Sequence, residues 1–231
     1  MNTKNNDDCI IDGGYAPDNG EEKTLCVLVL DDSGSMSGID ASGESKISQV
    51  QKGIDEVKVD IASNPQTSQK VEMCIELFNH AVRVVQKPAL VENINMPTLC
   101  AGGGTNLSGA VLKAIDEVAE RKAYYVEHGI PYKRPIIVLL TDGQAPIDSI
   151  VEKVKKGSAE KHYFIIPIAV GDDADMVALN KIASDRAYKI KDGHISSFFR
   201  WLSNSLGVIA NADPDAPVDL ENPFSGWAVN G

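Results

Sequence analysis

Oxygen-bearing side chains gather in the segment Asp31-Asp32-Ser33-Gly34-Ser35, which directly follows a run of six apolar residues. Asp31, Ser33 and Ser35 occupy alternate positions, so a tight turn can direct one carboxylate and two hydroxyls into a common space. These groups are hard oxygen donors, the type that Mg²⁺, Mn²⁺ and Ca²⁺ prefer. Because Ser, Gly and Asp are also the commonest turn residues, the segment alone fits an ordinary turn about as well as a metal site.

Two further polar turns favour the metal site over the ordinary turn. Residues 102–106, Gly-Gly-Gly-Thr-Asn, contain Thr105, and residues 141–143, Thr-Asp-Gly, contain Asp142. Asp31 and Asp142 each follow an apolar run that is typical of a buried strand, so their motifs meet at one edge of a sheet if the strands are neighbours. Three such turns converge by chance far less often than one polar turn occurs.

The three motifs resemble the metal-ion-dependent adhesion site of von Willebrand factor A domains. That site combines Asp-x-Ser-x-Ser, a Thr after glycines and Thr-Asp-Gly, and this chain carries them in the same order. The resemblance covers about residues 23 to 210. It implies a protein-interaction module whose metal keeps one coordination position open for an outside oxygen. An Asp or Glu carboxylate of a protein partner would fill that position, since it adds the missing negative charge.

The resemblance also implies the ligands. Ser33, Ser35 and Thr105 would give neutral oxygens to the cation, while Asp31 and Asp142 would bind it directly or through water. Mg²⁺ is the expected metal, with Mn²⁺ or Ca²⁺ as alternatives. Binding of the partner would then stop when the metal is removed by a chelator.

Two stretches resemble one group within this family. Residues 141–148, Thr-Asp-Gly-Gln-Ala-Pro-Ile-Asp, and residues 198–203, Phe-Phe-Arg-Trp-Leu-Ser, are similar to bacterial cytoplasmic A-domain proteins of the tellurium-resistance (TerY-like) group. This narrower resemblance implies a role in a stress-response complex that includes a kinase and a phosphatase.

An enzymatic interpretation rests on residues 34–38, Gly-Ser-Met-Ser-Gly, which resemble the Gly-x-Ser-x-Gly pattern of an α/β-hydrolase but have Met36 at the position of its serine. Ser37 would be the nucleophile, with Asp142 or Asp172 and then His194 following in the hydrolase order. However, a nucleophile elbow runs directly into a helix, whereas here a loop with another glycine intervenes, and the glycine triplet before Thr105 stays unexplained. We therefore predict a non-enzymatic module and keep a serine esterase as the alternative.

Two other acidic positions have simpler interpretations. Asp32 occupies the free position of the first motif, and we expect it to face solvent or to support the ligands from outside. Asp172, Asp173 and Asp175 follow an apolar strand pattern, and we expect this turn to cap the next helix rather than to bind a second metal.

Alternating strand and helix patterns must position these motifs. Residues 25–30 and 135–140 are apolar throughout, as in strands buried on both faces. Residues 70–79 alternate apolar and polar side chains, which predicts a half-exposed hairpin with residues 80–85 at a sheet edge. Apolar residues spaced by three and four predict a helix over 44–64 and another after residue 106. The remaining predicted elements are helices 147–159, 176–184 and 195–210 and strands 163–170 and 188–190.

This order of elements predicts the fold class. Strands that alternate with helices indicate an α/β fold with a doubly wound, mainly parallel sheet, one antiparallel edge strand and helices on both faces. A domains share this arrangement, so the pattern and the resemblance agree.

Composition limits the kinds of partner that the protein can bind and indicates where in the cell it is located. The chain has 22 Lys and Arg against 33 Asp and Glu, a formal net charge of −11, which makes nucleic acid or an anionic membrane surface a poor partner. No segment has the apolar length of a signal peptide or a membrane span, so we expect a cytoplasmic protein. The four cysteines lack Cys-x-x-Cys spacing and do not indicate a zinc site or a disulfide framework.

The chain divides into three predicted parts. Residues 1–22 form a polar arm, residues 23–211 form the A domain, and residues 212–231 form an acidic tail. The tail also holds apolar side chains that are unusual in a freely solvated end. We expect it to pack on its own domain, or to dock into a second copy where an acid could reach the metal site. The residues concerned are Leu220, Phe224, Trp227 and Val229, and the acids are Asp215, Asp219 and Glu221.

Overall fold

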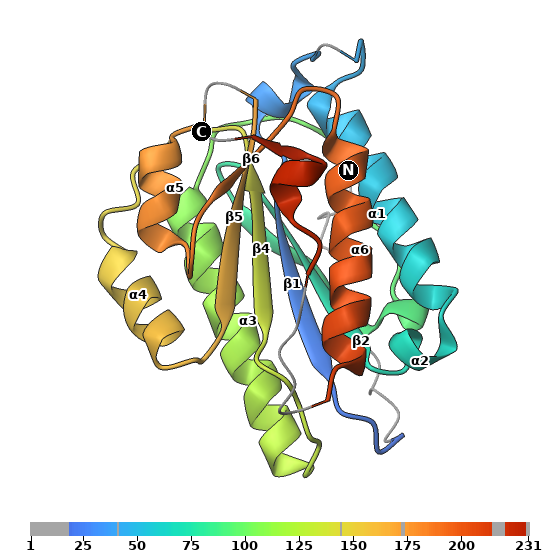
Figure 1. Ribbon diagram of the computed structural model, residues 1–231. Helices are drawn as coiled ribbons and strands as arrows, with labels where there is room; N and C mark the ends of the chain where they lie inside the picture. Colours follow the sequence, from blue (N-terminus) through green and yellow to red (C-terminus); the bar gives the residue numbers. More distant parts are fainter. Residues whose placement is uncertain (1–18, 41, 144, 172–173, 214–219, 230–231) are drawn as a thin grey trace, which may run out of the picture.

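A seven-stranded sheet forms the centre of the domain in a computed structural model, which describes residues 19–40, 42–143, 145–171, 174–213 and 220–229 (Figure 1). The strand order is β3-β2-β1-β4-β5-β6-β7. The strands are β1 (Thr24–Asp31), β2 (Val71–Phe78), β3 (Val82–Leu90), β4 (Ile136–Thr141), β5 (Phe164–Val170), β6 (Tyr188–Ile190) and β7 (Ala228–Val229).

Helices cover both faces of this sheet. They are α1 (Lys46–Ala62), α2 (Pro65–Ser68), α3 (Leu107–Glu127), α4 (Val151–Ala159), α5 (Met176–Ile182) and α6 (Ile195–Asn211), with 3-10 turns η1 (Gly34–Ser37), η2 (Val91–Asn93) and η3 (Pro223–Ser225). Helices α1 and α6 lie on one face and α3, α4 and α5 on the other (Figure 1). Their buried side chains form two core layers, one on each face. In the described part of the chain, no helix is both long enough and apolar enough to cross a membrane.

The apolar run of β1 explains why helices cover both faces of the sheet. Leu25, Val27 and Val29 enter the layer of α3, while Cys26 and Leu28 enter the layer of α1 and α6. All eight residues of β1 are buried, and the strand pairs in parallel with β2 and β4. The predicted doubly wound, mainly parallel α/β sheet is confirmed.

The edges of the sheet differ from the prediction. β3 is antiparallel to β2 at one edge, as expected. At the other edge β7 pairs antiparallel with β6, through Lys189 with Val229 and Ile190 with Ala228. The prediction of a single antiparallel edge strand is therefore incomplete, because two paired residues are too few to leave a periodic pattern.

The expected half-exposure of the β2–β3 hairpin is wrong for β2. All eight residues of β2 are buried, because α3 covers the face that carries its polar side chains. Glu72 is neutralised there by Arg121, with two hydrogen bonds of 2.7 Å, and accepts a third from the Tyr125 hydroxyl at 2.6 Å. Glu76 lies on the same strand with no hydrogen-bond partner for either carboxylate oxygen. Alternation of polar side chains here reflects buried carboxyl groups rather than contact with water.

Helices α1 and α6 pack closely at Gly53. A Cβ at this position would lie 2.0 Å from the ring of Phe199, which is itself fully buried. Only glycine therefore allows the ring to lie against the backbone of α1.

The segment from residue 220 to residue 229 packs on its own domain. The Trp227 side chain is 2% exposed and lies among the rings of Tyr188, Phe198 and Trp201. The Trp201 indole N–H donates to the Glu221 carbonyl at 2.8 Å. Residues 214–219, including Asp215 and Asp219, and most of the predicted amino-terminal arm lie outside the described residues.

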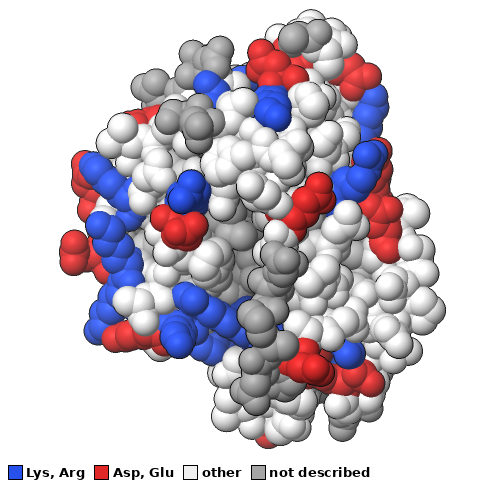
Figure 2. Space-filling view, in the orientation of Figure 1, with Lys and Arg blue, Asp and Glu red and all other residues white. Residues whose placement is uncertain are grey.

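Charged side chains are mixed over the face shown in Figure 2. Lysines and arginines gather over α4, whose sequence carries Lys153, Lys155 and Lys156, while acidic groups are scattered among them and along α1. Residues 1–23 and 213–231 carry −8 of the net charge of −11, so the rest of the chain has a net charge of only −3, which fits this mixed pattern.

Candidate metal centre

The sheet topology brings the first and third motifs together. β1 and β4 are parallel neighbours, paired as far as Leu30 with Leu140, so Asp31 and Asp142 follow adjacent strand ends. From β1 the chain passes to α1 on one face, and from β4 it passes to α4 on the other, which opens a crevice between the two strand ends. Ligand sites of open α/β sheets lie at such switch points.

The first motif forms a turn locked by its own side chains. Asp31 accepts a hydrogen bond from the Ser33 backbone N–H at 2.8 Å, and the Ser33 and Ser35 hydroxyls lie 3.0 Å apart. The other carboxylate oxygen of Asp31 accepts the Thr141 hydroxyl at 2.6 Å, which ties β1 to the end of β4. Burial raises the pKa of Asp31, the hydrogen bonds from Ser33 and Thr141 oppose that rise, and the nearby charge of Asp142 adds to it.

Asp142 receives one partner at each oxygen. Its Oδ1 accepts the Ser35 hydroxyl at 2.6 Å, and its Oδ2 lies 2.7 Å from the Lys46 ammonium. Lys46 is the first residue of α1, and sequence reasoning did not single it out. Lys46 is 96 positions from Asp142 in the chain, so no local pattern marks the pair.

The glycine loop carries the second motif onto the first. The Gly34 N–H donates to the Gly103 carbonyl at 3.0 Å, and the Gly102 N–H donates to the Asp32 carbonyl at 2.8 Å. Gly103 has a φ of +79°, and a Cβ there would lie 2.5 Å from the His80 ring, so this position requires glycine.

Thr105 thereby reaches the same space as the two carboxylates. A Cβ on Gly143 would lie 3.5 Å from the Thr105 hydroxyl oxygen and 3.7 Å from Asp31 Oδ2. Asn106, the next residue, caps α3 by accepting the Gly109 N–H at 3.1 Å, as the sequence predicted for one of these two positions. All five predicted residues, Asp31, Ser33, Ser35, Thr105 and Asp142, thus lie around one point at the sheet edge.

The donor chemistry of this cluster fits a hard divalent cation. Two carboxylates and three hydroxyls supply only oxygen, and the carboxylates are 0% and 2% exposed. An ammonium group already lies against Asp142, which shows that the site accommodates positive charge. The described residues include no group of three or more His, Cys, Asp or Glu side chains placed to hold a metal. A cation at this site would therefore need the three hydroxyls as ligands in addition to the two carboxylates.

Of the two positions expected for Asp32, the solvent-facing one is wrong, because this residue is buried. Its side chain is 2% exposed and pairs with Arg83, which the β3 hairpin folds over it. Burial raises the pKa of Asp32, while the charge of Arg83 acts in the opposite direction. The second carboxylate oxygen has no hydrogen-bond partner.

The acidic turn before α5 agrees with the capping prediction where it is described. Asp175 accepts the Ala178 N–H at 2.9 Å and so caps the helix. Asp172 and Asp173 lie outside the described residues.

The hydrogen bonds of the described residues do not assemble a hydrolase triad. The Ser37 hydroxyl donates to the Gly34 carbonyl at 2.7 Å instead of to a histidine. The ring of His194 lies 3.5 Å from the Ser197 hydroxyl, on its own helix. Asp172, one of the two candidate third members, falls outside the described part of the chain.

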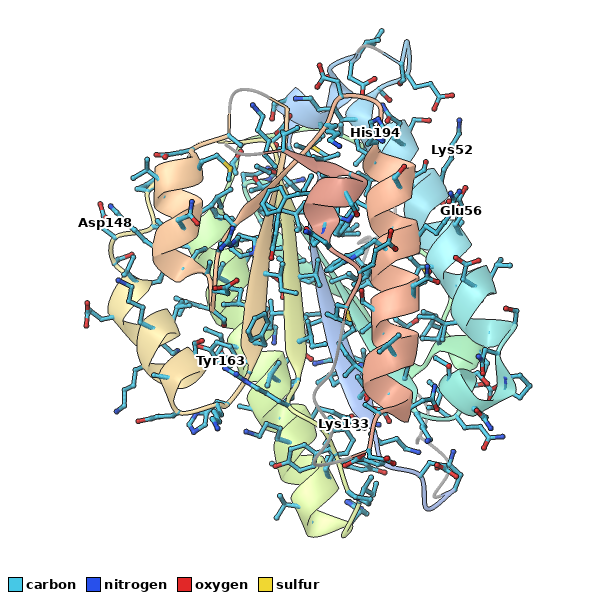
Figure 3. All side chains as sticks on the ribbon, in the orientation of Figure 1. Lys52, Glu56, Lys133, Asp148, Tyr163 and His194 are labelled. Carbon is cyan, nitrogen blue, oxygen red and sulfur yellow. The ribbon has the colours of Figure 1, made fainter. Side chains whose placement is uncertain are left out.

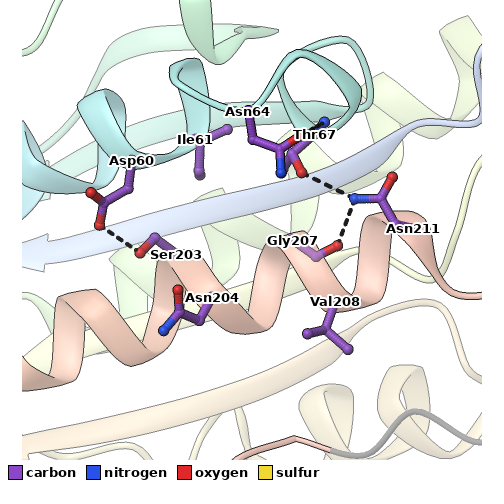
Figure 4. Close-up of a pocket in the computed structure, with 9 residues that line it drawn as sticks. All are labelled: Asp60, Ile61, Asn64, Thr67, Ser203, Asn204, Gly207, Val208 and Asn211. Atoms are coloured by element: carbon purple, nitrogen blue, oxygen red, sulfur yellow. Dashed lines mark hydrogen bonds between the residues drawn. The ribbon is translucent and has the colours of Figure 1, made fainter.

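A separate hollow of about 360 Å³ lies between α1, α2 and α6, away from the strand ends (Figure 4). Its polar groups bond to one another: Ser203 donates to Asp60 at 3.0 Å, and the Asn211 amide donates to Thr67 at 3.0 Å and to the Gly207 carbonyl at 2.9 Å. None of the residues that line this hollow belongs to the three motifs, so the hollow is separate from the candidate site.

Comparison with known proteins agrees with the fold. The family model described as von Willebrand factor type A domain matches residues 26–201. No protein with a curated description matches the chain at a significant level.

Several solved structures are similar to this chain in fold. The ArnB paralog VWA2 from Sulfolobus acidocaldarius is 20% identical with a TM-score of 0.56, over 80% of this chain and 45% of that one. Proximal thread matrix protein 1 from the mussel byssus, with a zinc-occupied MIDAS (metal-ion-dependent adhesion site) motif, is 19% identical with a TM-score of 0.55, over 80% of this chain and 48% of that one. BatB from Bacteroides thetaiotaomicron is 15% identical with a TM-score of 0.57, over 82% and 100%. The chain thus spans about half the length of the first two and all of the third.

Proposed function

Because this chain belongs to the von Willebrand factor type A domain family, we propose that it is a non-enzymatic protein-interaction module that works through a bound divalent cation. The observation that carries the proposal is the convergence of three oxygen-rich motifs on the crevice between β1 and β4. Buried carboxylates of Asp31 and Asp142 lie there beside three hydroxyls. Lys46 balances one of these two carboxylates, and a divalent cation would balance the negative charge that remains.

The proposed ligands are Ser33, Ser35 and Thr105 through hydroxyl oxygens and Asp31 and Asp142 through carboxylates, directly or through water. Mg²⁺ is the proposed metal, with Mn²⁺ or Ca²⁺ as alternatives. The zinc-occupied MIDAS motif of the mussel protein supports a divalent cation at this place in the fold without deciding which one binds here. When bound, the cation supplies a positive centre that accepts one further oxygen.

The proposed partner is a protein that presents an Asp or Glu to this centre. The net charge of −11 favours a protein over nucleic acid or an anionic membrane, since both of those carry the same sign. Hydrogen bonds from Thr141 to Asp31 and from Ser35 to Asp142 hold the carboxylates in place, so a partner's acid meets a preformed site.

A narrower proposal concerns the cellular role. Similarity of residues 141–148 to the tellurium-resistance group supports a cytoplasmic stress-response complex. The second similar stretch, residues 198–203, contributes less, because Phe198 and Phe199 are fully buried and serve to pack α6 on the sheet. The exposed surface around Asp148, which is 82% exposed, is therefore the part of this resemblance that a partner could contact.

Thermal melting of the metal-stripped protein, with and without Mg²⁺, Mn²⁺ or Ca²⁺, tests the proposal. A ligand present at a hundred times its Kd stabilises the native state by about 2.7 kcal/mol, or roughly 5 to 11 °C for a chain of this size. We expect such a rise in the wild type and in Asp148→Ala, whose carboxylate points away from the body of the domain (Figure 3). We expect none in the Asp31→Ala, Ser33→Ala double variant or in the milder Ser35→Ala variant.

A wild type that shows no rise with any of the three metals at millimolar concentration contradicts the proposal. A rise of equal size in the double variant also contradicts it, because the metal would then bind elsewhere.

A further inference from the structure

The Lys46 ammonium occupies one side of the candidate metal centre. Its Nζ lies 2.7 Å from Asp142 Oδ2, and the side chains of the two residues are only 13% and 1% exposed. The other oxygen of Asp142 is taken by the Ser35 hydroxyl. Both oxygens of Asp142 therefore already have a partner, and an incoming cation that approaches Oδ2 would meet the positive charge of Lys46.

The fold holds Lys46 in this position through two glycines. The Lys46 N–H donates to the Gly38 carbonyl at 2.9 Å, and a Cβ on Gly38 would lie 3.9 Å from Lys46 Cε. Gly171, at the end of β5, has a φ of +83°, and a Cβ there would lie 3.0 Å from Nζ and 3.2 Å from Cε. A side chain at Gly171 would thus crowd the end of the lysine, and the positive φ also favours glycine at this position.

Helix stability does not explain a lysine at this position. A positive charge at the first residue of a helix opposes the macrodipole, which favours acidic residues there. The first turn of α1 carries no acidic residue to offset it. Among the described residues, Lys46 forms an ion pair with Asp142 alone. This pairing points to a role for Lys46 at the metal centre.

We propose that Lys46 is an internal counter-ion of the metal centre, which neutralises Asp142 in the metal-free chain and competes with the divalent cation for it. This inference rests on the proposed function, since it concerns the same site. With Lys46 in place the charge of Asp31, Asp142 and Lys46 is −1 instead of −2. A cation must either displace the ammonium from Asp142 or bind beside it against its repulsion, and both routes weaken metal binding.

Calorimetric titration of the metal-stripped full chain with Mg²⁺ and with Mn²⁺ tests the inference. We expect Lys46→Met to bind each metal roughly tenfold more tightly than the wild type, because a unit charge near a divalent ion is worth about that much even with water-like screening. Lys46→Gln keeps a hydrogen-bond donor without the charge and should behave in the same way. Lys52→Met is the matched control, because Lys52 lies on the same helix, projects outward and, among the residues that the structure describes, forms an ion pair with Glu44 alone, at 2.6 Å (Figure 3). Its affinity should equal that of the wild type.

Melting temperature gives a second measurement that does not depend on calorimetric heats. Without metal, Lys46→Met should melt below the wild type, since Asp142 then has an unpaired buried charge. With saturating Mg²⁺ the difference should shrink or reverse.

Each outcome decides between the inference and the function on which it rests. Unchanged or weaker metal affinity in both Lys46 variants, with a wild type that binds, overturns the counter-ion role and leaves the proposed function standing. A chain that binds neither metal in any variant overturns both. Tighter binding in Lys46→Met and Lys46→Gln but not in Lys52→Met supports the counter-ion role.

Discussion

Glu76 makes the stability of this domain depend on pH in a way that one substitution removes. The side chain is 0% exposed, and neither carboxylate oxygen has a hydrogen-bond partner. Burial raises the pKa of Glu76 to about 8, the charge of Glu117 adds to the rise, and Lys113 opposes it. Glu117 is buried as well, but hydrogen bonds from Lys113 and Lys87 outweigh its burial and lower its pKa, so it stays ionised.

The size of the effect follows from the two pKa values. An unfolded Glu has a pKa of 4.5 here, so the folded chain holds the Glu76 proton more tightly than the unfolded chain does. The stability that this provides is complete below pH 4.5 and is lost as the pH rises toward 8, at about 1.4 kcal/mol per pH unit. At pH 7 the loss is about 3 kcal/mol.

The Glu76→Gln variant should escape this loss, because Gln resembles the protonated acid in shape and stays neutral. We expect it to unfold at the same urea concentration as the wild type at pH 4.5. At pH 7 its free energy of unfolding should exceed that of the wild type by about 3 kcal/mol, which raises the Tm by roughly 6 to 12 °C. Urea and thermal unfolding at several pH values between 4.5 and 8 measure both quantities.

Glu120→Gln is the control. Glu120 lies on α3 and pairs with Lys87, which also pairs with Glu117, but its side chain is 65% exposed. The effect of this substitution on the free energy of unfolding should be below about 0.5 kcal/mol at every pH. A difference between Glu76→Gln and the wild type that stays constant with pH would refute the reasoning. A variant less stable than the wild type at pH 7 would refute it as well.

Two further predictions concern packing. Gly53→Ala should destabilise the domain by about 1 to 3 kcal/mol, because its Cβ would overlap the buried Phe199 ring, whereas Gly207→Ala, whose Cβ would meet its nearest neighbour at 3.7 Å, should be neutral or slightly stabilising in urea unfolding. Equal effects of the two alanines would show that α1 and α6 can move apart freely. Trp227→Ala should cost about 3 to 5 kcal/mol, because it removes a ring that is 2% exposed from the cluster around Trp201. A cost below 1 kcal/mol in the same assay would mean that the carboxyl-terminal segment contributes little to the folded state.

Local patterns revealed most of the fold and the motifs. The apolar runs before Asp31 and Thr141 predicted buried parallel strands, and these became the neighbours β1 and β4. Spacing of three and four in the apolar residues predicted α1 and α3, and the glycine loop before Thr105 was placed correctly at the start of α3. In each case, the deciding information lies within about twenty residues of sequence.

Pairing between distant residues could not be read from the sequence. Arg121 neutralises Glu72 across 49 positions, and Lys46 reaches Asp142 across 96, so the alternation in β2 looked like solvent exposure and the lysine looked like part of a surface helix. The burial of Asp32 could not be decided for the same reason, because its partner Arg83 comes from a hairpin 51 positions away. Charge burial of this kind depends on which helix covers which strand, and only the assembled sheet determines that.

The pairing of β7 with β6 also affects how the protein can be made. A ribosome synthesises β6 some forty residues before β7, and during that interval the backbone groups on the outer side of β6 have no strand beside them. The rings of Tyr188 and Trp201 likewise lack their contacts with the Trp227 ring during this interval. A chain that lacks β7 leaves this edge of β6 uncovered, and we expect chains truncated before residue 228 to aggregate more readily than the full chain.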